Sequence, residues 1–245
     1  MAESPITVSL RHDPPTDRQL KALLLVSRPL ANLVAVTLRH SSYAAEHTTD
    51  QAQARRLLRE WQPDLVLIDI DHHDDLIDVI RGDDVRVPIL AFTRRRDTSV
   101  KLRAFGRGAD DIVEVPFTLD EIVARPYALL RRTQGTTAAM VPQIKIGGGL
   151  EVDLFAQTVK MNGGPRLDLT PIQQTLLYIL AANSGEVLSR EALLGTIWGA
   201  DFQIESNVVD RHIRELRVKL GDDWRAPRHI ETVPGKGYRF RPAPD

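Results

Sequence analysis

The chain contains no cysteine among its 245 residues. This absence excludes disulfide bonds and thiolate metal sites, and it fits a reducing cytosol. No apolar run approaches the roughly 20 residues that a transmembrane helix needs, and the N-terminus lacks a secretory pattern. We therefore expect a soluble cytoplasmic protein that does not enter a membrane.

The chain also lacks a strong excess of positive or negative charge, because it has 32 Lys and Arg residues and 33 Asp and Glu residues. A net charge of -1 argues against a protein that coats DNA indiscriminately, so any DNA binding must come from a local basic face. There is no Gly-rich phosphate loop, nucleophile elbow or convincing metal cluster. We expect neither an independent enzyme nor a cofactor.

The segment from Ser206 to Phe240 combines a basic amphipathic stretch with a glycine-punctuated hairpin. Its helical spacing places one apolar stripe on Val209, Ile213, Leu216 and Leu220. The opposite face carries Asn207, Arg211 and Arg214, which suit base edges in a major groove, while Arg217 and Lys219 suit phosphates. The alternative is a solvated helix face, since Asp210 and Glu215 lie in the same stretch.

The flanking residues favour DNA readout. Upstream, two helices are expected, one lined by leucines around Leu177 and one capped by Ser189. Downstream, 230–233 and 237–240 read as two strands around a Pro-Gly-Lys turn. Three helices followed by a terminal hairpin predict a winged helix-turn-helix domain.

Residues 167–240 resemble the DNA-binding domain of OmpR/PhoB-subfamily response regulators, carried by the pieces "LSREALL", "IWG", "VVDRHIRELRVKL" and "ETVPGKGYRF". The preceding IKIGGGLEVDLFAQTVKMNGG is similar to the small antiparallel platform that opens this domain, which we bound at 144–245. The resemblance implies a dimer on direct-repeat double-stranded DNA. It also implies that the loop ADFQIES (200–206) touches RNA polymerase.

By the same resemblance, base contacts fall on Asn207, Val208, Arg211, His212 and Glu215. Backbone contacts fall on Trp198, Arg214, Arg217, Lys236 and Tyr238. The wing has Pro234 where the family commonly has arginine, leaving Lys236 and Arg239 as nearby cations and weakening minor-groove readout. Trp198 and His212 also have a structural alternative, because each flanks the predicted core.

The N-terminal half alternates short apolar strands with helical stretches, which predicts an α/β doubly wound five-stranded parallel sheet. Strands are expected at 23–26, 43–47, 65–70, 88–92 and 111–115, with helices near 29–40, 50–61, 76–81, 98–107 and 118–132. Residues 21–132 resemble a receiver domain through "PDLVLIDI", "PILAFT" and "GADDIVEVPF". Residues 1–20 read as a flexible extension and 133–143 as a linker.

The receiver resemblance places Asp69 on the phosphoacceptor and Thr93 on the switch hydroxyl, but the rest of the pocket departs from the family. Ser27 and Arg28 replace the acidic pair that would bind Mg²⁺, and Val115 replaces the phosphate-binding lysine. Phosphoryl transfer depends on such charges. The sequence therefore predicts a receiver independent of phosphorylation, with a sensor kinase doubtful and a possible Arg28–Asp69 pair. The alternative is ordinary phosphorylation of Asp69 with a displaced metal site.

Two further departures concern the switch and the loop after Asp69. Ile112 stands where the family usually has an aromatic, so coupling through Thr93 is in doubt. The loop IDHHDDL brings Asp71, His72, His73, Asp74 and Asp75 together. A metal or pH-sensing role is conceivable, but a solvated acidic loop is favoured.

The resemblance implies a homodimer through the fourth helix, fifth strand and fifth helix of the receiver. Matching positions are Lys101, Phe105, Asp110, Asp111, Glu121 and Arg125. Cross-subunit pairs Lys101–Glu121 and Asp111–Arg125 are expected, and Phe105 replaces a basic residue by an apolar one, which favours a constitutive dimer. Pro126 predicts a kink or early break near Arg125 that could equally spoil this dimer.

Together these patterns predict a sequence-specific transcription regulator that binds DNA as a dimer, with its receiver as a dimerisation or ligand-sensing module. Two other hypotheses stay open. The receiver could be phosphorylated at Asp69, or the winged helix could bind a protein rather than DNA.

Overall fold

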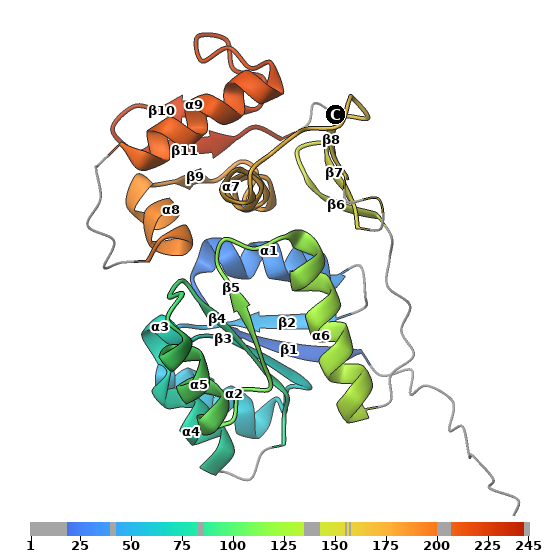
Figure 1. Cartoon of the computed structure of the whole chain (residues 1–245), viewed down its shortest axis with the longest axis vertical. Coiled ribbons are helices and arrows are strands. Elements are labelled where there is room, and N and C mark those ends of the chain that lie inside the picture. The colour runs from blue at the N-terminus through green and yellow to red at the C-terminus, as the bar shows by residue number, and fades with distance from the viewer. Residues whose placement is uncertain are drawn as a thin grey trace, which may run out of the picture.

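A computed structural model describes residues 19–39, 43–82, 86–134, 143–154, 156, 158–199 and 207–242. Most of the expected extension (1–20) and linker (133–143), and the loop 200–206, lie outside the described residues. Two domains are present, and α1 of the first lies against α7 of the second (Figure 1). None of the described helices has the length and apolar character needed to span a bilayer.

The N-terminal domain is a parallel five-stranded sheet in the order β2-β1-β3-β4-β5, which confirms the doubly wound prediction. Its strands are β1 (Leu20–Leu25), β2 (Tyr43–His47), β3 (Leu65–Asp69), β4 (Ile89–Thr93) and β5 (Asp111–Glu114). Its helices are α1 (Arg28–Arg39), α2 (Gln51–Glu60), α3 (Ile70–His73), α4 (Asp75–Gly82), α5 (Thr98–Arg107) and α6 (Leu119–Gln134). Every residue of β3 and β4 is buried, as expected for strands covered on both faces.

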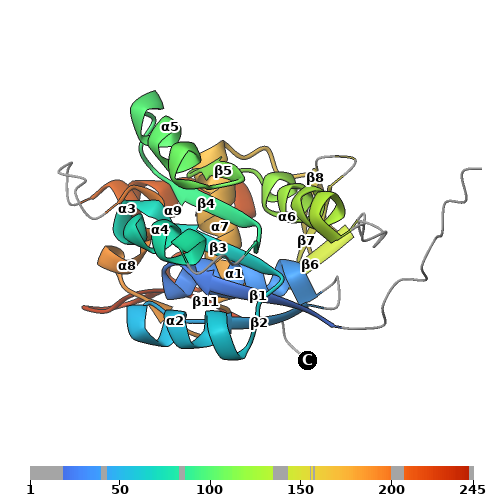
Figure 2. The ribbon, with the colours of Figure 1, turned by 90° about the horizontal axis from the view of Figure 1, so that it is seen from below.

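Helices cover the two faces of this sheet. Side chains of α1 and α6 pack on one face, and those of α2, α4 and α5 pack on the other. Figure 2 shows α2, α4 and α5 spread over the face that points away from the C-terminal domain. The carboxyl ends of the strands therefore meet at one edge, where functional groups of such folds gather.

Two local expectations for this domain were wrong. The segment after Asp69 is not a loop, since residues 70–73 form the short helix α3. The early break expected near Arg125 is also absent, because α6 continues past Pro126 to Gln134, while the alternative of a kink stays a prediction. The helix tolerates the missing backbone donor of Pro126 because the surrounding turns are held by buried contacts of Ile122, Leu129 and Leu130.

The C-terminal domain opens with an antiparallel sheet and continues into a winged helix, which confirms that prediction. The platform strands are β6 (Gln143–Gly147), β7 (Leu150–Asp153) and β8 (Thr158–Met161). The helices are α7 (Pro171–Ala182), α8 (Arg190–Ile197) and α9 (Val208–Leu220). The wing sheet has the order β10-β11-β9, formed by β9 (Val187–Leu188), β10 (Ile230–Val233) and β11 (Gly237–Phe240).

Caps and glycine conformation fix these elements. Thr170 and Gln173 form a capping box at the start of α7, and the Ser189 hydroxyl accepts from the Ala192 amide at the start of α8. Gly237 has φ +146°, and a Cβ there would lie 2.1 Å from the Leu188 carbonyl oxygen. Only glycine lets β11 pass β9 this closely.

The two domains are joined by buried polar contacts as well as apolar packing. The Thr175 hydroxyl donates to the Phe117 carbonyl (3.0 Å), and Asn183 Nδ2 donates to the Pro29 carbonyl (3.1 Å). Asn32 Nδ2 donates to Asn183 Oδ1 at 2.7 Å. One hydrophobic core runs from α1 into α7, so the domains pack as a continuous body.

Candidate functional site: an acidic pocket and a nucleic-acid interface

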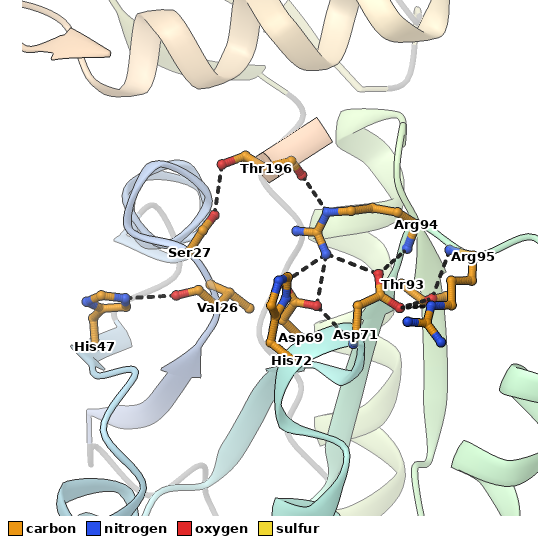
Figure 3. Close-up of polar contacts among 10 residues, drawn as sticks. All are labelled: Val26, Ser27, His47, Asp69, Asp71, His72, Thr93, Arg94, Arg95 and Thr196. Atoms are coloured by element: carbon orange, nitrogen blue, oxygen red, sulfur yellow. Dashed lines mark hydrogen bonds and ion pairs between the residues drawn. The ribbon is translucent and has the colours of Figure 1, made fainter. Parts of the chain in front are cut away.

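The first candidate site lies at the carboxyl ends of β3 and β4, which are parallel neighbours. Asp69 ends β3 and Thr93 ends β4, and both are buried, with 2% and 0% of their surface exposed. Figure 3 shows Asp69, Asp71 and Arg94 directed toward one another at this edge. Asp69 and Thr93 therefore lie in the same pocket, as expected.

Arg94 holds the Asp69 carboxylate. Its Nη1 donates to both oxygens, each at 2.8 Å. Both side chains are only 3% exposed, so the pair is almost fully removed from water. The Arg28–Asp69 hypothesis is wrong, because Arg28 is exposed at the start of α1 and the cation of the pocket is the residue that follows Thr93.

Asp71 joins the same network from the first turn of α3. It accepts from the Thr93 hydroxyl and from the Arg94 amide, each at 2.7 Å. Its side chain is 9% exposed, so the expectation of a solvated acidic loop is wrong for this residue. The strand-to-helix turn after Asp69 points Asp71 back into the pocket instead of into water.

The Asp69 carboxylate oxygens have further contacts within their own segment of the chain. The Asp71 amide donates to Asp69 Oδ1 at 3.1 Å, and His72 Nδ1 lies 3.2 Å from Oδ2. His73 lies on the same helix and lines the cavity beside the pocket. With Arg94, these contacts surround both carboxylate oxygens.

This pocket does not fit the magnesium ion that receivers use. Mg²⁺ requires carboxylate oxygens from the protein. The resemblance assigns Ser27 and Arg28 to the positions of the acidic pair, and the two buried carboxylates that are present, Asp69 and Asp71, both contact Arg94. The Asp69 oxygens face a guanidinium, and buried Val115 has no charge to offer a phosphoryl group. Within the part of the chain that the structure describes, no cluster of three or more metal-ligating side chains occurs.

The pocket also contacts the C-terminal domain. Arg94 Nε donates to the Thr196 carbonyl of α8 at 2.9 Å, and the Ser27 and Thr196 hydroxyls lie 3.1 Å apart (Figure 3). Arg94 therefore connects the Asp69 carboxylate directly to a helix of the winged-helix domain.

The second candidate site is α9 with the β10–β11 hairpin, on the side of the C-terminal domain away from the receiver-like sheet (Figure 1). Val209, Ile213 and Leu216 are buried as predicted. Lys219 is exposed but its Nζ donates to the Asp168 carbonyl at 2.6 Å, and four other expected DNA-contacting residues are exposed: Asn207, Arg211, Arg214 and Lys236. These side chains are available on the open face.

Several other predicted DNA contacts are engaged within the domain. Val208 is buried in the core, and Arg239 pairs with Glu231 across the hairpin at 2.8 Å. Glu215 accepts from Gln173 Nε2 at 2.8 Å. Arg217 Nη2 donates to the Ile230 carbonyl at 2.7 Å, so this arginine fastens α9 to β10.

Trp198, at the end of α8, and His212 of α9 lie against each other. Their rings stack with centroids 5.6 Å apart, and the His212 side chain is 13% exposed. Burial lowers the pKa of His212. The charge of Glu215 acts against this shift, and the charge of Arg211 adds to it. In the free protein, Trp198 and His212 therefore pack beside the core, which is the structural alternative to a role in DNA contact.

Tyr238 connects the wing to α8 and α9. Its buried hydroxyl donates to Asp210, which also accepts from Arg190 Nε at 2.8 Å. Burial, with the Asp210 hydrogen bond and charge, raises the pKa of Tyr238 to about 12. The ring lies under the Arg190 guanidinium, 4.9 Å from its centroid. This network fixes the wing relative to α9.

The predicted dimer face lies on α5, β5 and α6, because α3 shifts the helix count by one. Phe105 and Leu102 are 46% and 64% exposed on α5. Arg125 pairs within the chain with Asp111 (2.9 Å) and Glu121 (2.9 Å). Other predicted residues are also paired within the chain, Lys101 with Glu114 and Asp110 with Arg81. The cross-subunit pairs stay predictions.

Comparisons with known proteins agree with this two-part architecture. Residues 27–126 match the response regulator receiver domain, and residues 164–240 match the C-terminal domain of transcriptional regulatory proteins. The chain is 34% identical over 217 residues to the DNA-binding response regulator MtrA of Mycolicibacterium smegmatis, covering 87% of this chain and 92% of MtrA. It is 36% identical over 208 residues to the transcriptional regulatory protein PrrA of Mycobacterium tuberculosis, covering 83% and 88%.

Among solved structures, the response regulator DrrB of Thermotoga maritima, an OmpR/PhoB homologue, aligns with 25% identity and a TM-score of 0.42. It covers 91% of this chain and 100% of that one. A receiver-type sheet joined to a winged helix defines a transcriptional regulator. The chain belongs to the OmpR/PhoB-type family of DNA-binding response regulators.

Sequence reasoning missed Arg94, the central cation of the pocket. The available signal was its position, since it directly follows Thr93 at the strand end that borders Asp69. The run of three arginines at 94–96 resembles a solvated surface segment, which concealed this role.

Proposed function

We propose that this response regulator binds DNA independently of phosphorylation at Asp69. The observation that carries the proposal is the buried contact of Arg94 Nη1 with both Asp69 carboxylate oxygens. A nucleophilic carboxylate needs an exposed oxygen and a cation that holds the incoming phosphoryl group. Here the cation is the protein's own Arg94, and it already binds both oxygens of the Asp69 carboxylate, which would be the nucleophile.

The position of α9 supports DNA binding without release of the domains. The exposed side chains of Arg211 and Arg214 lie on the open side of the molecule, and the receiver packs on α7 and α8. Base readout by these arginines and phosphate contacts by Lys236 would supply affinity. The proposed target is direct-repeat double-stranded DNA.

The proposed dimer uses the α5, β5 and α6 face. Phe105 and Leu102 offer apolar surface there, while the charged residues around them are paired within the chain. Exposed ion pairs contribute only about 0 to 1 kcal/mol, so apolar burial must carry association. Phe105→Glu is expected to weaken the dimer in sedimentation experiments. Exposed Val218→Glu on α9 is the matched control, and an unchanged dimer in the Phe105 variant would refute this face.

Intact-mass measurement tests phosphorylation directly. Wild-type protein treated with acetyl phosphate and Mg²⁺ is expected to show no phosphoryl adduct. A variant with Ser27→Asp, Arg28→Asp, Arg94→Ala and Val115→Lys restores the charges that receivers use, and it serves as the positive control. A wild-type adduct that Asp69→Asn abolishes would refute the proposal and favour a sensor kinase partner.

Contact of residues 200–206 with RNA polymerase remains a further proposal from the family resemblance. These residues lie outside the described part of the chain. Protein binding by the winged helix is the competing function, and steep salt dependence of DNA affinity would argue against it, because phosphate contacts release counterions.

A further inference from the structure

A cavity of about 340 Å³ lies between the two domains, beside the Asp69 pocket. Pro29 of α1 and Gly195 of α8 line it from the two domains, together with His72 and Arg94. Cavities of roughly 300 to 1,000 Å³ are typical of small-molecule sites, especially between domains. The volume suits a small organic molecule and excludes a folded partner.

One buried donor faces this cavity without an acceptor. Arg94 uses Nη1 for Asp69 and Nε for the Thr196 carbonyl, but Nη2 has no hydrogen-bond partner among the described residues. The Arg94 side chain is 97% buried, since only 3% is exposed. In Figure 3, this nitrogen points toward Ser27 and away from Asp71. Buried donors are almost always paired, so a bound molecule or an ordered water is expected at this nitrogen.

We propose that the cavity binds a small uncharged organic molecule that presents a carbonyl oxygen to Arg94 Nη2. The charge of Arg94 is already balanced by Asp69 and Asp71, which lie 2.8 and 3.3 Å from Nη1. An anion placed beside Nη2 would also lie close to the Asp69 carboxylate, and like charges repel strongly in a buried site. A neutral acceptor satisfies Nη2 without that cost.

Binding at this site is coupled to the domain arrangement. The cavity walls come from α1 and α8, and Arg94 contacts both the receiver pocket and Thr196. A molecule that contacts both walls binds only when the domains are packed together, so it shifts the population toward this arrangement. The site goes beyond the proposed DNA binding and does not depend on it.

Titration of the full-length protein with acetophenone and with benzoate tests the proposal. The two probes have similar bodies, but one offers a neutral carbonyl and the other a carboxylate. In ¹H–¹⁵N spectra, acetophenone is expected to shift the Ala192 and Gly195 amides and the Arg94 Nε signal saturably. Benzoate is expected to bind about tenfold more weakly because of the repulsion from Asp69.

Gly195→Leu provides the cavity-filling variant. A Cβ at Gly195 meets no atom within 4 Å, and leucine is a better helix former than glycine. This variant is expected to lose acetophenone binding while remaining folded. Gly82→Leu makes the same change where a Cβ also meets nothing, away from the cavity, and should bind like wild type.

Either of two outcomes overturns the proposal. The first is the absence of saturable shifts with acetophenone, which would leave the cavity to water alone. The second is equal acetophenone binding by wild type and Gly195→Leu, which would place the probe elsewhere. Because neither DNA nor a phosphodonor enters the titration, failure of this site is distinguishable from failure of the proposed function.

Discussion

At the residue scale, the state of Asp69 is set by its neighbours. Arg94 neutralises the carboxylate in a pocket from which water is almost excluded, and Asp71 shares the same guanidinium. Breaking a buried ion pair by removing one partner leaves an uncompensated charge, which costs several kcal/mol in other proteins. The pair is therefore structural, and its loss should affect folding.

Asp69→Asn is expected to lower the free energy of unfolding by about 3 kcal/mol. This value lies at the low end for buried pairs because Asp71 still faces Arg94. Urea unfolding of the full chain measures the change. Asp78→Asn is the matched control, because Asp78 pairs with Arg107 at the surface and its loss should matter much less. Equal stabilities of the two variants would contradict the buried role.

His212 predicts a pH dependence of stability. Burial lowers its pKa in the folded state, whereas the unfolded chain has an ordinary value of about 6.5. As the pH falls below that value, the unfolded state takes up the proton first, so folding stability decreases until the lowered folded pKa is reached.

His212→Phe keeps an aromatic ring against Trp198 but cannot be protonated. The stability of wild type relative to this variant should fall as the pH is lowered from 8 to 5, measured by urea unfolding. His229, whose pKa is also lowered by burial, is present in both proteins and cancels in the difference. A difference that does not change with pH would contradict this account.

At the element scale, α9 has two classes of arginine. Arg211 and Arg214 are exposed, whereas Arg217 is committed to the Ile230 carbonyl and to the Thr232 hydroxyl at 2.8 Å. A basic helix read from sequence alone treats all three as DNA contacts. The packing of α9 against β10 leaves Arg211 and Arg214 available to contact DNA, whereas Arg217 holds the wing.

Arg211→Ala is expected to weaken DNA binding by roughly 1 to 3 kcal/mol while leaving stability unchanged. Arg217→Ala is expected to lower thermal stability, because a buried carbonyl loses its donor. Fluorescence anisotropy with labelled DNA and thermal unfolding separate the two effects. Arg55→Ala, an exposed change on α2, is the control. The reverse pattern for Arg211 and Arg217 would refute this division.

The elements themselves were largely predictable from the sequence. Strands such as β3 and β4 are continuous apolar runs, and the α9 stripe repeats at helical spacing. The helix α3 was missed because four residues, IDHH, are too short to display a helical period. Arg94 was missed because its burial depends on the side chains of Asp69 and Asp71, which converge only after the sheet has formed.

At the scale of the whole molecule, the packing of the two domains was not predicted from the sequence. Thr175 lies on α7 and Asn183 caps its C-terminal end. In the sequence, such polar residues beside leucines look like tolerated substitutions. In the structure they bind backbone groups of the receiver, with Thr175 hydrogen bonded to Phe117 and Asn183 to Pro29. A polar residue that is buried in an apolar helix face therefore marked an interface.

Thr175→Val is expected to destabilise the packed arrangement by roughly 1 to 3 kcal/mol, because the Phe117 backbone groups lose their buried partner. Hydrogen exchange should then become faster in α7 than in the receiver sheet, whereas in wild type the two are expected to open together. Thr37→Val is the control, since that buried hydroxyl donates to the Val34 carbonyl of the same helix, α1. Unchanged exchange in Thr175→Val would contradict the coupling.

Independence from phosphorylation is tested by the affinity for DNA from the upstream region of its own gene, measured with and without Mg²⁺ and acetyl phosphate. The same salt-sensitive affinity is expected under both conditions, because Arg94 binds the Asp69 oxygens in each. Tighter binding only after phosphodonor treatment, abolished by Asp69→Asn, would contradict it and establish Asp69 as a working phosphoacceptor.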